Sequence, residues 1–367
     1  MRVMEQKTAF SKLKNIEFIR FFFAAAIVYF HLLYAFIMPY TGGAPVYETL
    51  ADQAKYAKYI VECFFIISGY FLFRSVQRRP DQPTGSFIIK KIFRLWPVLA
   101  VSTILSVILL DQPMANAVVN LFFLQSTTLA TVWSGLNWYV SAFFVAEVFY
   151  FMLYKAMRNS HGMKLLICIL VYFGYSMNLV NADGGFARGI VYGVFSLAVA
   201  RAVAGVGLGY LIGWGYHYIE DIVKRLDDGA FRKKVLDLAI SFLEIVSLLC
   251  LLLDFFNGRR APGNQFLVVI FFTIFFLCML TERGMFSRIV SRTPFCRLGK
   301  YAYSIYVMQI IAFYILRKTF WRNTAFLSSH PAASLLISVA AAVLLGILTY
   351  YLVEKPAGKL SKWIVRD

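Results

Sequence analysis

Charge is scarce in this sequence. Only 15% of its 367 residues are Asp, Glu, Lys or Arg, whereas 60% are hydrophobic and 17% are aromatic. A soluble chain of this length cannot bury that much apolar surface inside its own core. The shortage of charge therefore excludes an ordinary soluble protein and favours one that is embedded in a membrane.

Cysteine is also rare, and its spacing excludes two further kinds of site. The five cysteines occur singly, mostly within apolar segments, and the pair C-x-x-C does not occur in the sequence. A disulfide framework or a structural metal centre would need cysteines grouped at short, regular spacings. We therefore expect neither disulfide bonds nor a metal site in this protein.

Long apolar segments, by contrast, run through the whole chain. About ten of them have the length of roughly 20 residues that spans a bilayer core of about 30 Å. The predicted spans are 15–38, 56–73, 88–110, 138–157, 163–181, 190–217, 235–256, 264–282, 301–318 and 332–353. We predict an all-α fold, a polytopic transmembrane helix bundle that forms a single membrane domain over residues 1–367. The stretch 114–130 is shorter and more polar, so we expect it to lie at the interface or to re-enter the membrane.

Positive charge is the one kind of charge that the sequence has in excess, with a formal net charge of +18 at pH 7. Most of the 37 Lys and Arg residues fall on one side of the membrane when the amino terminus is placed in the cytoplasm. Cytoplasmic loops are enriched in these residues, so we predict that both termini are cytoplasmic. The basic charge then reflects topology and contact with membrane lipids, and we expect no nucleic-acid partner. A second use, the attraction of an anionic cytosolic ligand, stays open.

A few ionisable residues nevertheless lie inside the predicted spans. Such residues are costly in a bilayer, so each is a candidate for a functional role by default. They are Arg20, His31, Glu62, Glu147 and Arg201, with Glu244 as a weaker member.

Arg20 and His31 share one face of the first predicted helix. Their separation in the sequence places them within about 20° of each other around the helix and about 16 Å apart along its axis. Glu17 lies one turn before Arg20 and can pair with it. Arg20 could instead extend to the interface beside Glu17, and His31 could be a packing residue held by a hydrogen bond. The shared face favours a joint function.

Histidine is the side chain best suited to take a proton from a hydroxyl group near neutral pH. A carboxylate could orient the His31 ring, and Glu62 and Glu147 are the acids available inside the spans. Glu147 itself needs a partner, which could be Arg20, Arg201 or His31.

The segment KKIFRLWP at 90–97 opens the third span with three cations. Lys91 and Arg94 are three residues apart and face the same side of a helix, where they could hold a phosphate group. The alternative is that they only anchor the helix at the cytoplasmic surface. Ser68 and Gly69 interrupt the second span, and a glycine there permits the close approach of either a ligand or another helix.

Aromatic and small residues mark two more segments. Trp138 begins the fourth span at the outer interface, where it could belong to an aromatic belt or stack on a sugar. Tyr150 lies one turn after Glu147 and shares its face. The glycines at 205–215 in the sixth span predict close packing of helices and not a nucleotide-binding loop, which would need a preceding strand.

Six segments, in order from one terminus to the other, resemble acyltransferase family 3, the ten-span membrane O-acyltransferases. They are the R-x10-H pattern of Arg20 and His31, FFIISGYFL at 64–72, KKIFRLWP at 90–97, NWYVSAFFVAEVFY at 137–150, LGKYAYSIYVMQ at 298–309 and YYLVEKP at 350–356. Each motif alone is weak, but six in order are specific. The chain departs from the family pattern at Gln309, where many members carry histidine, and at Ala302, where many carry serine.

The resemblance implies an enzyme that transfers acyl groups other than aminoacyl groups. The group is most often acetyl, the donor is cytosolic acyl-CoA, and the acceptor is a hydroxyl of a cell-surface or lipid-linked saccharide. Acyl-CoA would be a co-substrate, with no permanently bound cofactor. The protein would be a multi-pass component of the bacterial plasma (inner) membrane.

On this basis we expect three groups of site residues. His31 would deprotonate the acceptor hydroxyl, Arg20 would fix the donor, and Glu147 would orient a partner. The donor-binding residues would be Lys91, Arg94 and Ser68, and the acceptor-binding residues would be Trp138, Tyr150 and Gln309.

Two other classes of protein would use some of the same features. A carrier that moves a saccharide or an acyl group without chemistry could use intramembrane Arg, His and Glu equally well. Many such transporters consist of two related halves, and this sequence shows no internal repeat, which mildly disfavours that class. A structural or sensory membrane protein would leave the six ordered motifs unexplained.

Overall fold

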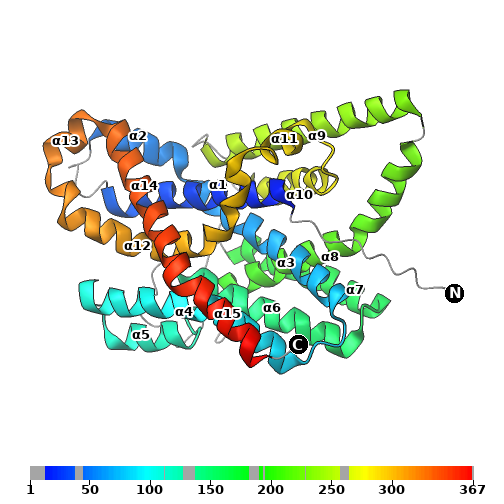
Figure 1. The fold of residues 1–367 in the computed structure, drawn as a ribbon, viewed down its shortest axis with the longest axis horizontal. Helices are drawn as coiled ribbons and strands as arrows, with labels where there is room; N and C mark the ends of the chain where they lie inside the picture. Colours follow the sequence, from blue (N-terminus) through cyan, green and yellow to red (C-terminus); the bar gives the residue numbers. More distant parts are fainter. Residues whose placement is uncertain are drawn as a thin grey trace.

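The computed structural model describes residues 13–37, 44–110, 112–126, 137–181, 190–192, 195–227, 229–256 and 264–365. Helices form nearly all of this part of the chain (Figure 1). The α-helices are α1 (Lys14–His31), α2 (Pro45–Ala54), α3 (Ile60–Arg78), α4 (Thr84–Leu110), α5 (Met114–Leu121), α6 (Trp138–Met157), α7 (His161–Asn181), α8 (Leu197–Leu226), α9 (Ala230–Phe256), α10 (Leu267–Leu280), α11 (Met285–Val290), α12 (Ala302–Lys318), α13 (Thr324–Ser329), α14 (Pro331–Thr349) and α15 (Lys355–Ile364).

Shorter elements complete the described chain. Two segments are π-helical, η1 (Leu32–Ile37) directly after α1 and η9 (Tyr350–Glu354) directly after α14. Two very short strands, β1 (Ile190–Tyr192) and β2 (Phe195–Ser196), pair antiparallel.

The structure confirms the predicted fold class, an all-α bundle with several helices that can cross a membrane. Within the described residues, eight helical stretches are long and apolar enough to cross a membrane. The two other predicted spans, 264–282 and 301–318, correspond to α10 and α12, with 14 and 17 residues. Both are shorter than the roughly 20 residues of a full crossing, so the number ten stays a prediction. The predicted interfacial stretch contains α5, whose eight residues cannot cross a bilayer, and its end, 127–130, lies outside the described residues.

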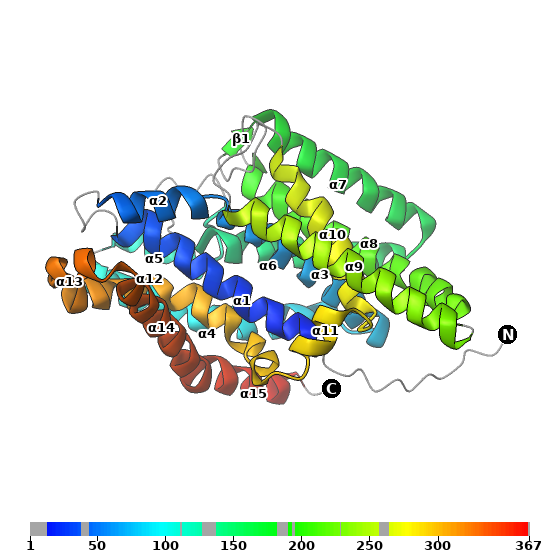
Figure 2. The same ribbon diagram turned by 90° about the horizontal axis from the view of Figure 1, so that it is seen from above.

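Helix α1 lies in the middle of the bundle, with α12 and α14 on one side and α9 and α10 on the other (Figures 1 and 2). Phe23 shows how tightly it is held. Its ring packs edge-on against Phe255 of α9 at 6.0 Å between centroids, and it also contacts Phe272 of α10 and Phe64 of α3. Phe23 therefore joins α1 to three neighbouring helices.

The closest helix contact joins α3 to α8, and glycine makes it possible. A Cβ atom on Gly69 would overlap the backbone carbonyl of Val206, and a Cβ on Gly209 would overlap that of Ile66. Gly69 of α3 and Gly209 of α8 thus serve helix packing, as small residues commonly do in membrane bundles. Helix α6 packs on α8 as well, so α3 and α6 share α8 as a neighbour.

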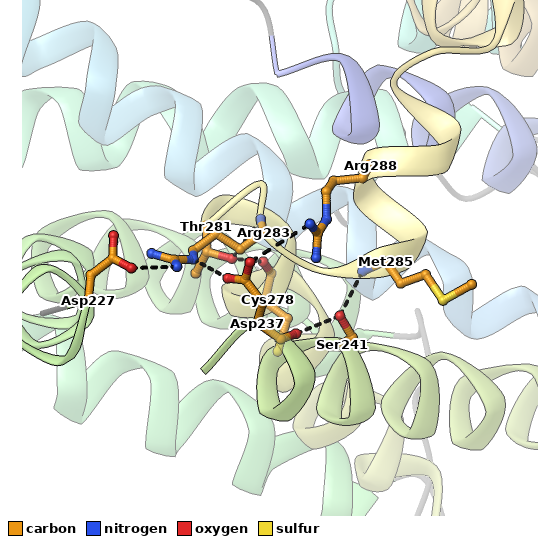
Figure 3. A network of polar contacts seen from close by, with 8 residues as sticks. All are labelled: Asp227, Asp237, Ser241, Cys278, Thr281, Arg283, Met285 and Arg288. Atoms are coloured by element: carbon orange, nitrogen blue, oxygen red, sulfur yellow. Dashed lines mark hydrogen bonds and ion pairs between the residues drawn. The ribbon is translucent and has the colours of Figure 1, made fainter. Parts of the chain in front are cut away.

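A polar network joins three segments at the end of the bundle where α1 begins (Figure 3). Arg283, in the turn after α10, donates to Asp227 after α8 at 2.8 Å and to Asp237 of α9 at 2.6 Å. The Met285 amide donates to the Ser241 hydroxyl at 3.0 Å. The Arg283 hydrogen bond holds the pKa of Asp227 below its ordinary value. The network therefore ties the α8–α9 hairpin to the α10–α11 turn.

Replacing Gly209 with Val should prevent α3 and α8 from packing. The expected result is loss of the monodisperse, heat-stable protein in detergent, measured by size exclusion and thermal unfolding. Gly215→Ala, in the same helix, is the matched control because a Cβ there meets nothing within 4 Å. Equal stability of the Gly209→Val variant and the wild type would contradict this account of the bundle.

The Asp227–Arg283 pair predicts a pH-dependent stability. Because the pKa of Asp227 is lowered in the folded protein, the pair stabilises the fold above its ordinary pKa of about 4, and this contribution is lost as the pH falls through the lowered value. At pH 7 the melting temperature of Asp227→Asn should therefore lie below that of the wild type, and the difference should shrink as the pH is lowered below about 4. Asp221→Asn, at an exposed position of α8, is the control. A difference that does not change with pH would count against the pair.

Candidate functional site

A cavity with a volume of about 630 Å³ opens at the end of the bundle where α1 begins. Helices α1, α3, α4, α6 and α12 contribute its walls. Its deeper wall is apolar and aromatic, with Phe64 and Ile67 from α3 and Tyr139 and Phe143 from α6. Such a cavity can hold an elongated ligand that has one polar end and one less polar end.

Positive charge dominates the mouth of this cavity. Seven basic side chains line it against two acidic ones. The basic residues are Arg20 of α1, Arg74 and Arg78 of α3, Arg79 after α3, and Lys90, Lys91 and Arg94 of α4. They converge because α3 ends, and α4 begins, at the same end of the bundle, with only a short turn between them. Grouped cations in a partly enclosed space bind phosphate groups well.

The sequence predicted only part of this cluster. Lys91 and Arg94 were expected at a donor site together with Ser68, and all three line the cavity. Arg74, Arg78 and Arg79 were not expected there, because the positive-inside rule already explained their charge. The spacing of Arg74 and Arg78, one helical turn apart at the end of α3, is the signal that could have indicated them.

Arg20 pairs with Glu17 as predicted. Its guanidinium donates to the Glu17 carboxylate at 2.7 Å, and both side chains line the cavity. Each side chain is less than one fifth exposed. The pair therefore places a guanidinium in the cavity wall, between the cations of the mouth and the helix segment that leads to His31.

Glu147 has a partner that the sequence did not predict. Its carboxylate forms an ion pair with the Lys91 ammonium group, which also lies over the rings of Phe87 and Phe143. The expected partners were Arg20, Arg201 and His31. The carboxylate meets Lys91 because α4 and α6 pack side by side, which no single helix pattern reveals. Lys91 thus enters the cavity already engaged by a carboxylate.

Glu62 and Arg201 form a second pair inside the bundle, between α3 and α8. The Arg201 guanidinium donates to one Glu62 oxygen from Nε at 2.7 Å, and it lies over the Trp138 ring at 5.0 Å. Trp138 is 9% exposed, so the structure places it beneath Arg201 and not in a lipid-facing belt. Glu62 therefore holds Arg201, whereas it was one of the two acids expected to orient His31.

Tyr150 lies away from the cavity. Its ring is buried between α6 and α8, and its hydroxyl donates to the Val203 carbonyl at 2.8 Å. The expected role in acceptor binding has no geometric support, because Tyr150 serves the packing of these two helices.

His31 meets Gln309 at the far end of α1. The His31 Nδ1 atom lies 3.0 Å from the Gln309 Oε1 atom of α12. Neither residue lines the cavity, but Ile27 and Tyr306, each about one turn earlier on the same two helices, do. The cavity thus ends about 6 Å along the helix axis before this pair. The π-helix η1 begins at the residue after His31, and such helices often mark functional sites.

Glu354 is a further polar residue that the sequence did not single out. It ends the π-helix η9 and accepts a hydrogen bond from Ser304 at 2.5 Å. Arg94 and Arg20 are close enough to interact electrostatically with its carboxylate. The motif YYLVEKP was noted for its resemblance alone, and the structure now places its glutamate beside the cationic wall.

Comparison with known proteins assigns the chain to a family. A family model described as an acyltransferase domain matches residues 13–351. No curated protein and no solved structure matches the chain. The family match covers nearly all of the 367 residues, including the helices that wall the cavity and the His31–Gln309 pair. The chain belongs to acyltransferase family 3.

Proposed function

We propose that the protein transfers an acyl group, most simply acetyl, from cytosolic acyl-CoA to a hydroxyl of a cell-surface or lipid-linked saccharide. The observation that carries this proposal is the cationic cavity, which ends one helical turn before the His31–Gln309 pair. We place the protein in a bacterial plasma membrane with the cavity mouth facing the cytoplasm, because the mouth carries the basic loops.

The donor would enter through the cationic mouth. Coenzyme A carries a pyrophosphate and a further phosphate on its ribose, and these groups match Arg74, Arg78, Arg79, Lys90 and Arg94. Its pantetheine arm is long and weakly polar, which suits the aromatic inner wall. Arg20, between the cationic mouth and the aromatic inner wall, would hold the donor near its thioester. Glu147 would hold Lys91 in place through their ion pair.

The chemistry would take place at the inner end of the cavity. The acceptor hydroxyl oxygen attacks the thioester carbonyl carbon, and His31 takes the hydroxyl proton. The carbon–sulfur bond then breaks, the new ester leaves with the acceptor, and coenzyme A leaves as its thiol after receiving the proton. Fixing donor and acceptor in one enclosed space supplies much of the rate enhancement. The proposed step does not use Trp138, which packs against Arg201, or Tyr150, which packs against α8. In this proposal Gln309 acts through His31.

A labelling experiment tests this function. Membranes containing the wild-type protein and radiolabelled acetyl-CoA should transfer label to a saccharide, identified by mass spectrometry. His31→Ala should abolish transfer without loss of folded protein, because it removes the base. His330→Ala, at an exposed position outside the bundle, should keep wild-type activity. Transport of a solute without acylation, or full activity of His31→Ala, would contradict the proposal.

Donor binding can be tested at the mouth of the cavity. Arg74→Ala and Arg78→Ala should each raise the KM for acetyl-CoA about tenfold or more, because a charge-assisted contact to phosphate contributes about 1.5–3 kcal/mol. The effect should shrink at high salt. Arg232→Ala removes an exposed arginine of α9 at the same end of the bundle and should leave the KM unchanged. Equal KM values in all three variants would exclude this donor site.

Variants of the Lys91–Glu147 pair show whether the pair only supports the fold or also takes part in the reaction. Glu147→Gln leaves a mostly buried ammonium group without its countercharge, which should destabilise the protein by about 3–5 kcal/mol. The double variant Lys91→Met, Glu147→Leu should regain most of this stability, measured by thermal unfolding. If the pair only supports the fold, the double variant also regains activity. We expect it to stay inactive, because Lys91 faces the donor in the cavity.

A further inference from the structure

The Gln309 side chain is held in one orientation. It is completely buried on α12, and its Nε2 group donates to the Tyr306 carbonyl, one turn earlier, at 2.7 Å. This bond turns the Oε1 atom toward His31, where it lies 3.0 Å from Nδ1. If the amide were reversed, its oxygen would face the Tyr306 carbonyl oxygen, and a buried hydrogen bond would be lost.

An amide oxygen can only accept a hydrogen bond. The contact with Gln309 therefore requires that His31 Nδ1 carries a hydrogen atom. In the neutral imidazole, a proton on Nδ1 leaves the lone pair on Nε2. When the ring gains a second proton, Nδ1 still donates to the same oxygen, so the contact survives both states of the ring.

We propose that Gln309 is a positioning residue that holds His31 as the Nδ1–H tautomer and so presents Nε2 as the proton acceptor. The tautomer itself does not depend on the proposed function, but the role of Nε2 in accepting the acceptor's proton does. Glutamine suits the task because it is uncharged. Unlike a carboxylate, it fixes the ring without strongly stabilising the imidazolium form, which cannot act as a base.

The helix packing around the pair supports a fixed geometry. Leu32 and Leu33, which follow His31 in the π-helix, are fully buried against neighbouring helices. Ile310 and Ile311, which follow Gln309, are buried as well. Because both helices are packed directly after the contact residues, the imidazole and the amide have little freedom to separate.

The tautomer can be measured directly. The chain has only four histidines, so the imidazole nitrogen resonances of protein labelled with ¹⁵N-histidine can be assigned in detergent, with His31→Asn identifying the His31 signals. In the wild type, Nδ1 should give the resonance of a protonated nitrogen and Nε2 that of an unprotonated one. Gln309→Met keeps the side-chain volume and removes the acceptor, so the Nε2–H form should appear. Gln309→Glu keeps an acceptor and should retain the Nδ1–H form.

Kinetics supply a second readout. Gln309→Met should lower kcat by about 10²-fold, the scale of lost general-base catalysis, with an unchanged KM for acetyl-CoA, because the cations of the mouth are untouched. Gln309→Glu should keep more activity than Gln309→Met. Gln112→Met, the same substitution outside the α-helices, is the control and should behave as wild type.

The outcomes separate the two claims. A wild-type spectrum with the proton on Nε2, or an unchanged spectrum in Gln309→Met, overturns the role of Gln309 even if acyl transfer is observed. A wild-type spectrum with the proton on Nδ1 that shifts in Gln309→Met supports the role. If such a protein transfers no acyl group, the proposed function fails and the assigned tautomer stands.

Discussion

The structure depends on the neutralisation of charge inside an apolar helix bundle. A charged group that leaves water needs a partner of opposite sign, and in two pairs of this bundle the partners lie on different helices. Glu62 of α3 holds Arg201 of α8, and Glu147 of α6 holds Lys91 of α4. Each pair fixes two helices next to the cavity. Together with the glycine contact of α3 and α8, these pairs join helices that border the cavity to their neighbours.

The charge of the site differs between the two ends of the cavity. Seven basic side chains against two acidic ones give the cavity a net positive charge, which suits a phosphate-bearing ligand. At the inner end, His31 meets an uncharged amide in place of a carboxylate. One molecule thus combines a strongly cationic cavity mouth with an uncharged contact between an imidazole and an amide beyond its inner end.

Much of the fold followed from the sequence, because a long apolar run has few alternatives to a helix in a membrane. The predicted span 138–157 has the bounds of α6, and the Arg20–Glu17 pair lies on one helix and was predicted from spacing. The partner of Glu147 and the burial of Tyr150 were not predictable, since both depend on which helices are neighbours. Arg78 was missed because topology alone accounted for its charge. The contact of His31 with Gln309 joins α1 to α12, and only the structure shows it.

The most direct test of the account is the structure of the protein with a non-reactive thioether analogue of acetyl-CoA, determined by electron cryo-microscopy. The account predicts the phosphate groups between the arginines at the end of α3 and the basic first turns of α4, with the sulfur end directed along α1 toward His31. An analogue bound elsewhere, or bound in the cavity with its phosphates at the His31 end, would contradict it.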